Sequence, residues 1–293
     1  MHLVLDTDIG SDADDALALA VVAGSPELTL DAVITVYGDT RLRARLARRY
    51  LANTTLPRNL LVASGTEAAR SGRDVWWAGH EGSLFTDLES QPTATGGVRL
   101  LTEIVAARPG KVDVLAIGPL TNIAAALDLD PKFESNVRTL VMMGCDFRGG
   151  AAAAPEHNIE MDIDAAQRVF ASGLDIVVGG LDLTLRHALC APEVAEIAGS
   201  GPLGRILADE IDVWWRYIDE DQNCPHDAVL AIWLARPDMF TSTRSQVEID
   251  DLGRSIAHPD REGRVRILDT SNPAAITAEI VARIVSASRS ADR

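Results

Sequence analysis

The chain has 293 residues, enough for one large α/β domain or for two average ones. Its 27 basic and 43 acidic side chains leave a formal net charge of −16, which argues against a general binder of nucleic acid or anionic membranes. The 3 cysteines are widely separated and form no CxxC pair, so we expect a reducing, cytoplasmic compartment. No apolar stretch approaches the roughly 18 residues of a membrane-spanning helix.

Short apolar runs alternate with segments of helical periodicity through the first two-thirds of the chain. Because the runs are continuously apolar, we expect buried strands of a parallel sheet that helices cover on both faces. The expected strands are residues 2–6, 32–37, 60–63, 112–117, 137–142 and 176–179. The expected helices between them are residues 16–24, 41–52, 97–108, 120–127 and 165–172.

The pattern becomes mostly helical after residue 184. Helices are expected from Pro192, over residues 203–217 and over 227–234, and strands at 247–249 and 265–268 precede a closing helix at 273–285. No Pro/Ser-rich linker or internal repeat divides the chain. We therefore expect one α/β domain over residues 1–293, with a mostly parallel central sheet, a Rossmann-like core and extra helices in the C-terminal third.

Arginine is dense in the second expected helix. Apolar residues recur there at helical spacing, so we interpret the arginines as a solvated helix face and not as a nucleic-acid patch. The arginines are Arg41, Arg43, Arg45, Arg48 and Arg49, and the inward residues are Leu42, Leu46 and Leu51.

Carboxylates crowd the turn after the first expected strand, namely Asp6, Asp8, Asp12, Asp14 and Asp15. One aspartate can cap the following helix, but the others would repel one another unless a cation neutralised them. Ligands of open α/β sheets bind at this edge, beyond the carboxyl ends of the strands. Several carboxylates suit Ca²⁺ better than Mg²⁺, so we expect a bound calcium ion.

A Mg²⁺-dependent phosphatase of the haloacid dehalogenase type is an alternative, because such enzymes also open with a strand that ends in Asp-x-Asp. Their chemistry requires a lysine that balances the phosphate charge. The two lysines of this chain are Lys111, before an expected strand, and Lys132, in an Asp-Pro-Lys turn. The phosphatase hypothesis therefore predicts a lysine close to Asp6, and the positions of the lysines do not favour it.

Four separated motifs together resemble the nucleoside hydrolases of the inosine-uridine preferring type. They are Asp6-Thr7-Asp8-Ile9-Gly10 with Asp14-Asp15-Ala16, Gly118-Pro119-Leu120-Thr121-Asn122-Ile123-Ala124, Glu156-His157-Asn158 and His226-Asp227. The resemblance covers most of the chain. It implies hydrolysis of the N-glycosidic bond of ribonucleosides to free base and ribose, by a homodimer or homotetramer.

The resemblance also implies a catalytic centre. Ca²⁺ would be held by Asp8, Asp15, Asp227 and the main-chain carbonyl of Thr121, and would bind the ribose 2′ and 3′ hydroxyls. Asp8 would act as the general base toward a water that the metal orients. His226 would assist the leaving base as an acid, because histidine titrates near neutrality.

Further residues are expected to contact the substrate. Asp14 and Asp39 would recognise the ribose, and His80 belongs to a loop that resembles the family's loop over the site. Glu156 and Asn158 would point the same way in an extended segment and hold the 5′ hydroxyl.

Tryptophans are candidates for stacking on the base. They are Trp76, Trp214 and Trp215, and because the last two are neighbours on one helix, at least one of them is expected in the core.

Three departures from the family pattern leave the base preference open. The Asp-rich loop is two residues longer, so Asp12 competes with Asp14 or Asp15 for a role. Asp39 replaces the usual asparagine, and Gly149-Gly150-Ala151 replaces a region where another asparagine is common. A non-catalytic nucleoside- or sugar-binding homologue is therefore the alternative from another class.

Overall fold

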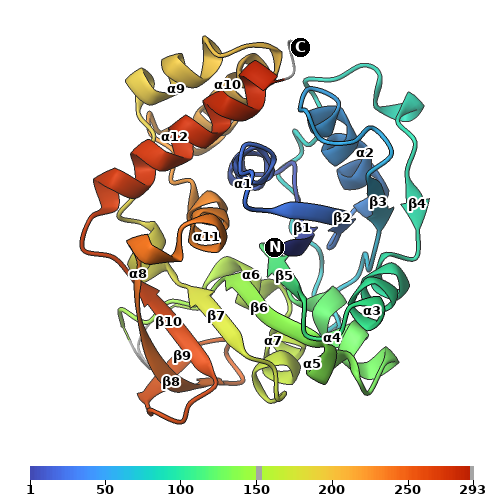
Figure 1. The fold of residues 1–293 in the computed structure, drawn as a ribbon, viewed down its shortest axis with the longest axis vertical. Helices are drawn as coiled ribbons and strands as arrows, with labels where there is room; N and C mark the ends of the chain where they lie inside the picture. Colours follow the sequence, from blue (N-terminus) through green and yellow to red (C-terminus); the bar gives the residue numbers. More distant parts are fainter. Residues whose placement is uncertain (150–153, 291–293) are drawn as a thin grey trace.

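The structure is a computed structural model that describes residues 1–149 and 154–290. One ten-stranded sheet runs through it in the order β4-β3-β2-β1-β5-β6-β7-β10-β8-β9 (Figure 1). The strands are β1 (His2–Thr7), β2 (Thr29–Thr35), β3 (Leu61–Ser64), β4 (Ala94–Thr95), β5 (Val112–Ala116), β6 (Val137–Met143), β7 (Ile176–Gly179), β8 (Thr241–Ile249), β9 (Ser255–Pro259) and β10 (Val265–Asp269).

Helices connect and cover these strands. They are α1 (Asp14–Ala23), α2 (Thr40–Leu51), α3 (Gly97–Ala107), α4 (Thr121–Leu129), α5 (Phe133–Asn136), α6 (His157–Met161), α7 (Ile163–Phe170), α8 (Leu181–Thr184), α9 (Ala191–Ala198), α10 (Pro202–Ile218), α11 (His226–Ala235) and α12 (Pro273–Ser290). Short 3-10 turns lie at Leu88–Ser90 and Pro237–Met239.

The sheet is parallel from β4 to β10, and only β8 and β9 pair antiparallel at its end. The strand order reverses at β1, because β2 pairs with one side of it and β5 with the other. Segments that follow β1, β2, β5, β6 and β7 therefore meet at one edge of the sheet. This is the switch point where open α/β sheets bind ligands.

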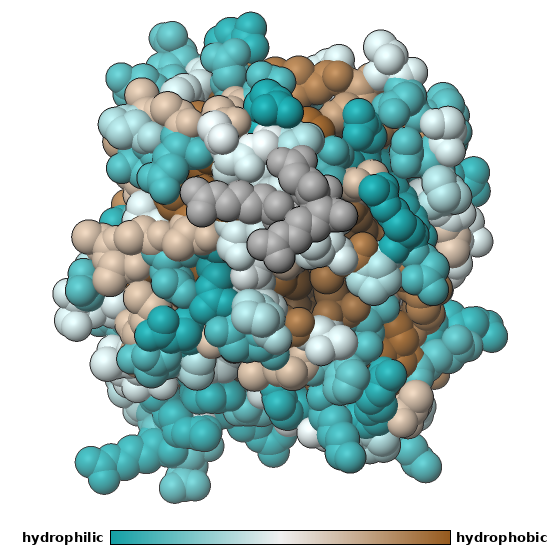
Figure 2. Space-filling view, turned by 45° about the horizontal axis from the view of Figure 1, so that its top comes forward, coloured by the Kyte–Doolittle hydropathy of each residue, from teal (hydrophilic) through white to brown (hydrophobic). Residues whose placement is uncertain are grey.

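Two apolar layers cover the sheet. One contains α1, α11 and α12, which pack together on one face, and the other contains α3, α4 and α7 on the opposite face (Figure 1). Both faces of β1 and β5 are buried, as the continuous apolar runs of these strands require. On the face shown in Figure 2, hydrophilic residues form most of the periphery and hydrophobic residues are seen mainly in recesses.

The predicted α/β fold with a mostly parallel sheet is confirmed, and each expected strand and helix exists with bounds shifted by a few residues. Five short elements were not predicted: β4, β9, α5, α6 and α8. Strand β8 begins at Thr241 and not at residue 247, because its first part is exposed and polar and so has no apolar pattern. Residues 150 and 151, which belong to the stretch where the family commonly has another asparagine, lie outside the described residues.

The arginine-rich helix α2 differs from its interpretation at one position. Leu46 and Leu51 are buried as expected, and Arg41 is exposed. Arg43, however, is only 1% exposed, so it belongs to the buried face and not to the solvated one.

A glycine sets the distance between α1 and α12. A Cβ added at Gly24, just after α1, would lie 2.0 Å from the backbone oxygen of Arg283 in α12. Backbone atoms cannot move aside as a flexible side chain does, so the two helices require glycine here.

We expect Gly24→Ala to lower the free energy of unfolding by about 1–3 kcal/mol, because the added methyl group forces α12 away from α1. Urea denaturation monitored by circular dichroism measures the change. Gly199→Ala is the matched control: Gly199 also follows a helix, and its nearest atom would lie 3.4 Å away. Equal losses in the two variants would contradict this packing role.

Candidate active site

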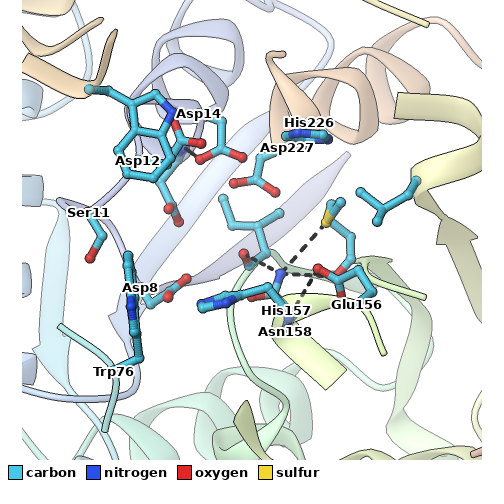
Figure 3. A pocket seen from close by; sticks show the side chains of 15 residues that line it. Asp8, Ser11, Asp12, Asp14, Trp76, Glu156, His157, Asn158, His226 and Asp227 are labelled. Atoms are coloured by element: carbon cyan, nitrogen blue, oxygen red, sulfur yellow. Dashed lines mark hydrogen bonds between the residues drawn. The ribbon is translucent and has the colours of Figure 1, made fainter. Parts of the chain in front are cut away.

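A cavity of about 320 Å³ opens at the carboxyl edge of the sheet, beside the switch point. This volume lies within the range of small-molecule sites. Its lining comes from segments far apart in the sequence, namely Asp8, Ser11, Asp12, Asp14, Asp15, Trp76, Ile117, Met143, Glu156, His157, Asn158, Leu181, Trp214, His226 and Asp227 (Figure 3). Three of the four sequence motifs thus supply residues that line the cavity. The fourth motif, Gly118–Ala124, lies next to the cavity, because Gly118 contacts Asp8.

The Asp-rich turn leads from β1 into α1 without a side-chain cap. Helix α1 begins at Asp14, and its N-cap residue Ala13 has no capping side chain. The Asp12 carboxylate accepts a hydrogen bond from the backbone N–H of Ala13, and the Asp14 carboxylate accepts one from the backbone N–H of Asp15. Helix capping therefore does not account for this cluster of carboxylates.

Three carboxylates form a compact group at the cavity wall. Ligand oxygens of Asp14, Asp15 and Asp227 all lie within 4.8 Å of one another, and all three residues are buried. Burial, and then the charges of Asp14 and Asp15, raise the pKa of Asp227 well above its usual range. Buried Oδ1 of Asp227 has no hydrogen-bond partner among the described residues. A hard divalent cation fits this set, because it would supply the missing positive charge and use the free oxygen.

Asp8 lines the same cavity but lies outside this compact group. Its Oδ1 approaches the backbone of Gly118, where an added Cβ would be only 2.6 Å away. Burial raises the pKa of Asp8, and the positive charge of Arg43 opposes that rise. The compact group contains Asp14 beside the expected ligands Asp15 and Asp227, and the expected metal-ligand role of Asp8 stays a prediction.

Asp6 and Asp12 have other surroundings. The Asp6 carboxylate lies beneath the cavity and accepts a 2.7 Å hydrogen bond from the amide of Asn122. Asp12 does line the cavity, and the amide of Asn223 donates to its Oδ1 over 3.1 Å. Burial raises the pKa of Asp12 to about 7. The longer loop therefore adds a carboxyl group to the cavity and not to the compact group.

Thr121 is not among the residues that line the cavity, and the expected role of its main-chain carbonyl as a metal ligand stays a prediction. It is the first residue of α4, and its hydroxyl donates a 2.6 Å hydrogen bond to Asp162. Ile117, which ends the preceding strand segment, lines the cavity instead. Its carbonyl accepts a 3.1 Å hydrogen bond from Asn158. Ile117 therefore contributes to the cavity wall, and its carbonyl is bonded to Asn158.

Glu156 and Asn158 both line the cavity, but the segment is not extended throughout as assumed. Glu156 is the N-cap of α6 and accepts from the N–H groups of Asn158 and Ile159, and also from that of Cys145. Burial raises the pKa of Glu156 to about 7. The Asn158 amide joins the ends of two strands through the carbonyls of Ile117 and Met143 (Figure 3).

His226 lines the cavity at the start of α11, next to Asp227. Its Nδ1 lies 2.8 Å from the Thr184 hydroxyl. Burial, and then the nearby His187, lower the pKa of His226 to about 4. Where Thr184 donates this bond, Nε2 holds the hydrogen of a neutral imidazole. This lowered pKa differs from the titration near neutrality that the sequence analysis assumed, and the role of His226 toward the leaving base stays a prediction.

Asp39 lies outside the cavity. It is exposed, and its carboxylate caps α2 by accepting a 2.9 Å hydrogen bond from the N–H of Leu42. The expectation that Asp39 contacts ribose is corrected, because its oxygens point to the helix end. His80 contacts two residues of the cavity lining: its Nε2 lies 2.7 Å from the carbonyl of Ser11, and its ring packs against Trp214.

Aromatic side chains line one side of the cavity. Trp76 and Trp214 both face it, and Figure 3 shows Trp76 on the side opposite Glu156. Trp214 stacks on Tyr217 with ring centroids 5.4 Å apart. Trp215 packs against the hydrophobic core instead. The expectation that at least one of the paired tryptophans is a core residue agrees with this arrangement.

No lysine of the described residues lines the cavity, and both lysines are exposed. Lys111 precedes β5 and so lies at the opposite edge of the sheet. The carboxylate of Asp6 meets Asn122 where the phosphatase requires a lysine. The phosphatase hypothesis is therefore wrong.

Six residues at or near the site were not identified as site residues from the sequence: Ser11, Arg43, Ile117, Met143, His157 and Leu181. Ile117 contributes through its backbone and Ser11 through a loop, so their residue types give no chemical signal. Arg43 was hidden among the other arginines of α2. Two signals were available: its position four residues after Asp39, and its helical spacing of three and seven residues from the apolar Leu46 and Tyr50.

These features define an α/β protein with an acidic ligand cavity at the switch point of its sheet. The model of the family "Inosine-uridine preferring nucleoside hydrolase" matches residues 3–283. The chain belongs to this family, whose members hydrolyse the N-glycosidic bonds of ribonucleosides, and it is a ribonucleoside hydrolase.

Individual relatives agree with this assignment. The "Non-specific ribonucleoside hydrolase RihC" of Salmonella newport (strain SL254) is 32% identical over 277 residues, which cover 90% of this chain and 89% of the relative. Among solved structures, a "Purine-Preferring Ribonucleoside Hydrolase from Gardnerella vaginalis" superposes with a TM-score of 0.84, 23% identity and 99% coverage of each chain. The inosine-uridine preferring nucleoside hydrolase from Bacillus anthracis gives a TM-score of 0.77 at 19% identity, over 97% of this chain and 99% of that one.

Within the described part of the chain, no helix combines the length and apolar character needed to cross a membrane.

The three-carboxylate group predicts a cation-dependent stability. In a chelator, the native protein should have a lower melting temperature than in Ca²⁺, with a gain of about 2.7 kcal/mol when Ca²⁺ reaches a hundred times its Kd. Asp227→Asn should melt at or above the native protein in chelator, because one buried charge is removed, and should lose the rise with Ca²⁺. Differential scanning fluorimetry measures both effects.

Asp39→Asn is the matched control, because asparagine caps a helix as well as aspartate does. It should keep the full rise in melting temperature. A native protein that does not respond to Ca²⁺, or an Asp227→Asn variant that responds fully, would contradict the cation site.

Proposed function

We propose that the chain is a Ca²⁺-dependent ribonucleoside hydrolase in which Asp8 is the general base and His226 assists departure of the base. The observation that carries this proposal is the convergence of Asp8, the three-carboxylate group and His226 on one buried cavity. The residues that would hold the cation are Asp8, Asp15, Asp227 and the main-chain carbonyl of Thr121, as the family resemblance implies, with Asp14 in the same acidic group. When bound, the cation would neutralise these carboxylates and orient the ribose diol.

The side chains of the cavity then divide the reaction between them. The Asp8 carboxylate accepts the proton of the attacking water, which adds to the anomeric carbon as the N-glycosidic bond breaks. Positive charge that develops on the ribose is stabilised by the carboxylates around it, as in glycoside hydrolysis generally. The His226 N–H donates a hydrogen bond to the departing base. The base then takes up a proton from solvent, and the protonated Asp8 releases its own.

The substrate orientation follows from the two sides of the cavity. Trp76 and Trp214 give apolar faces on which a base stacks, while Glu156 and Asn158 lie at the other side, toward the ribose 5′ end. We assign His80 to the rim above the base. Aromatic stacking accepts purines and pyrimidines alike, and the curated relative is described as non-specific, so we propose a broad base range. A cytoplasmic location, a role in nucleoside salvage and a homodimer or homotetramer are also proposed, from the family resemblance.

A nucleoside panel tests the activity. Inosine, uridine, adenosine, guanosine and cytidine are incubated with the enzyme in Ca²⁺ or in chelator, and free base is measured by liquid chromatography. We expect base release in Ca²⁺ only. Asp8→Asn should lower kcat by about 10²–10⁴-fold, because it removes the general base, while Asp39→Asn should not.

Binding of nucleosides without release of base in Ca²⁺ would support the non-catalytic homologue instead. Full activity in chelator would sink the cation dependence but leave the hydrolase assignment in place.

The role of His226 is tested by the leaving group. His226→Ala should slow the hydrolysis of inosine strongly, because the departing hypoxanthine requires a hydrogen bond. A nitrophenyl riboside, whose leaving group departs as a stable anion, should be affected much less. Steady-state kinetics with both substrates measures the difference, and equal losses would assign His226 to positioning only.

A further inference from the structure

We propose that Arg43 is a positioning residue of this hydrolase, which fixes the backbone of the Asp8 loop so that the Asp8 carboxylate faces the cavity. The inference rests on the proposed role of Asp8. It concerns a side chain that does not line the cavity and that lies on α2, outside the four sequence motifs.

The first observation is the burial of Arg43. It is 1% exposed, and among the described residues it is the one arginine or lysine in the buried class. Taking a guanidinium out of water costs several kcal/mol unless its N–H groups are fully used. A fold that places such a group beside an acidic cavity therefore requires that it make specific contacts.

The second observation is where the guanidinium donates its hydrogen bonds. Nη1 donates to the carbonyls of Asp8 and Ile9, the latter over 3.0 Å, and Nε donates to the carbonyl of Tyr37 over 2.7 Å. These carbonyls lie in the turns after two neighbouring strands, β1 and β2. One planar group thus ties the two turns together, which is a geometry that arginine provides and lysine does not.

The backbone of these turns needs such support. Tyr37 has a φ of 65°, which is unusual for a residue with a side chain, and Gly10 has a φ of 120°. The Arg43 bonds reach the carbonyl of Tyr37 itself and, on the two sides of Gly10, the carbonyl of Ile9 and the hydroxyl of Ser11. We infer that the guanidinium holds the conformation that presents Asp8.

The third observation connects Arg43 to residues 76–81, which we call the covering segment and which supply Trp76 to the cavity lining. The guanidinium carbon lies 4.8 Å from the ring centroid of Trp77, so the indole covers the charged group. Both terminal nitrogens also lie within 3.5 Å of the Ser11 hydroxyl. Ser11 in turn donates to Glu81 over 2.8 Å, and the Glu81 carboxylate accepts from the backbone of Ala78 and Gly79. Arg43 therefore contacts the Asp8 loop and, through Trp77 and Ser11, the covering segment.

Arg43→Lys tests the proposal, because it retains the charge but not the planar set of donors. We expect kcat for inosine to fall by about 100-fold, the usual result of an approximately 1 Å displacement of a reacting group. KM should change little, because Arg43 does not touch the substrate cavity. Rates are expressed per Ca²⁺-binding site, so that partial unfolding does not imitate the effect.

Arg41→Lys is the matched control. Arg41 is exposed, lies two residues earlier on α2, and undergoes the same chemical change. It should keep the native kcat and KM.

Arg43→Ala adds a readout that loss of stability alone would not give. Millimolar methylguanidine should restore part of its kcat in a saturable manner, because the small cation can occupy the vacated position, whereas methylammonium should not. This arm also decides the case if Arg43→Lys fails to fold.

The outcomes separate this inference from the proposed function. A folded Arg43→Lys with native kcat, an effect on KM alone, or no rescue by methylguanidine would overturn the positioning role while native activity stands. If the native protein releases no base from any nucleoside, the proposed function itself fails.

Discussion

Repulsion between buried carboxylates is the constraint on which the site depends. Asp14, Asp15 and Asp227 lie together in a cavity wall, and burial raises the pKa of each well above its usual range. Such a cluster destabilises the fold unless a cation or protons compensate for it. The same negative potential is useful to a reaction in which positive charge develops on a sugar. The charge that costs stability in the free protein thus stabilises the transition state that we propose.

The sheet topology makes this concentration of charge possible. Asp14 and Asp15 begin α1, whereas Asp227 begins α11, more than two hundred residues later. The two helices pack side by side on one face of the sheet, so their N-termini lie together (Figure 1). The positive ends of both helix dipoles therefore point toward the carboxylates and offset part of their repulsion. Polar side chains such as Asn122 and Asn158 then join the ends of neighbouring strands and keep the cavity edge rigid.

The irregular loops are held by a different device. The positive charge of Arg43 offsets part of the negative charge at Asp8. Its N–H groups donate to backbone carbonyls of the turns after β1 and β2. Ser11 then transmits this contact to Glu81 in the covering segment. A surface arginine of α2 such as Arg45 pairs with an exposed glutamate instead, and exposed pairs of this kind contribute little to stability. Residues of one type, two positions apart on one helix, therefore have quite different roles.

The amino-acid sequence alone determined the α/β class and the order of strands and helices, and the resemblance of its four motifs to a family implied the reaction. Continuous apolar runs can only be strands covered on both faces, and several aspartates after a buried strand require a counter-charge. Local patterns cannot show which way a side chain of an irregular turn points. For this reason only the tertiary structure showed Asp39 at a helix end, Asp14 grouped with Asp15 and Asp227, and His226 buried in the cavity wall. Arg43 is the sharpest case, because its spacing from Leu46 and Tyr50 is that of the buried face while its charge predicts a solvated position, and only packing against the turns of two strands buries it.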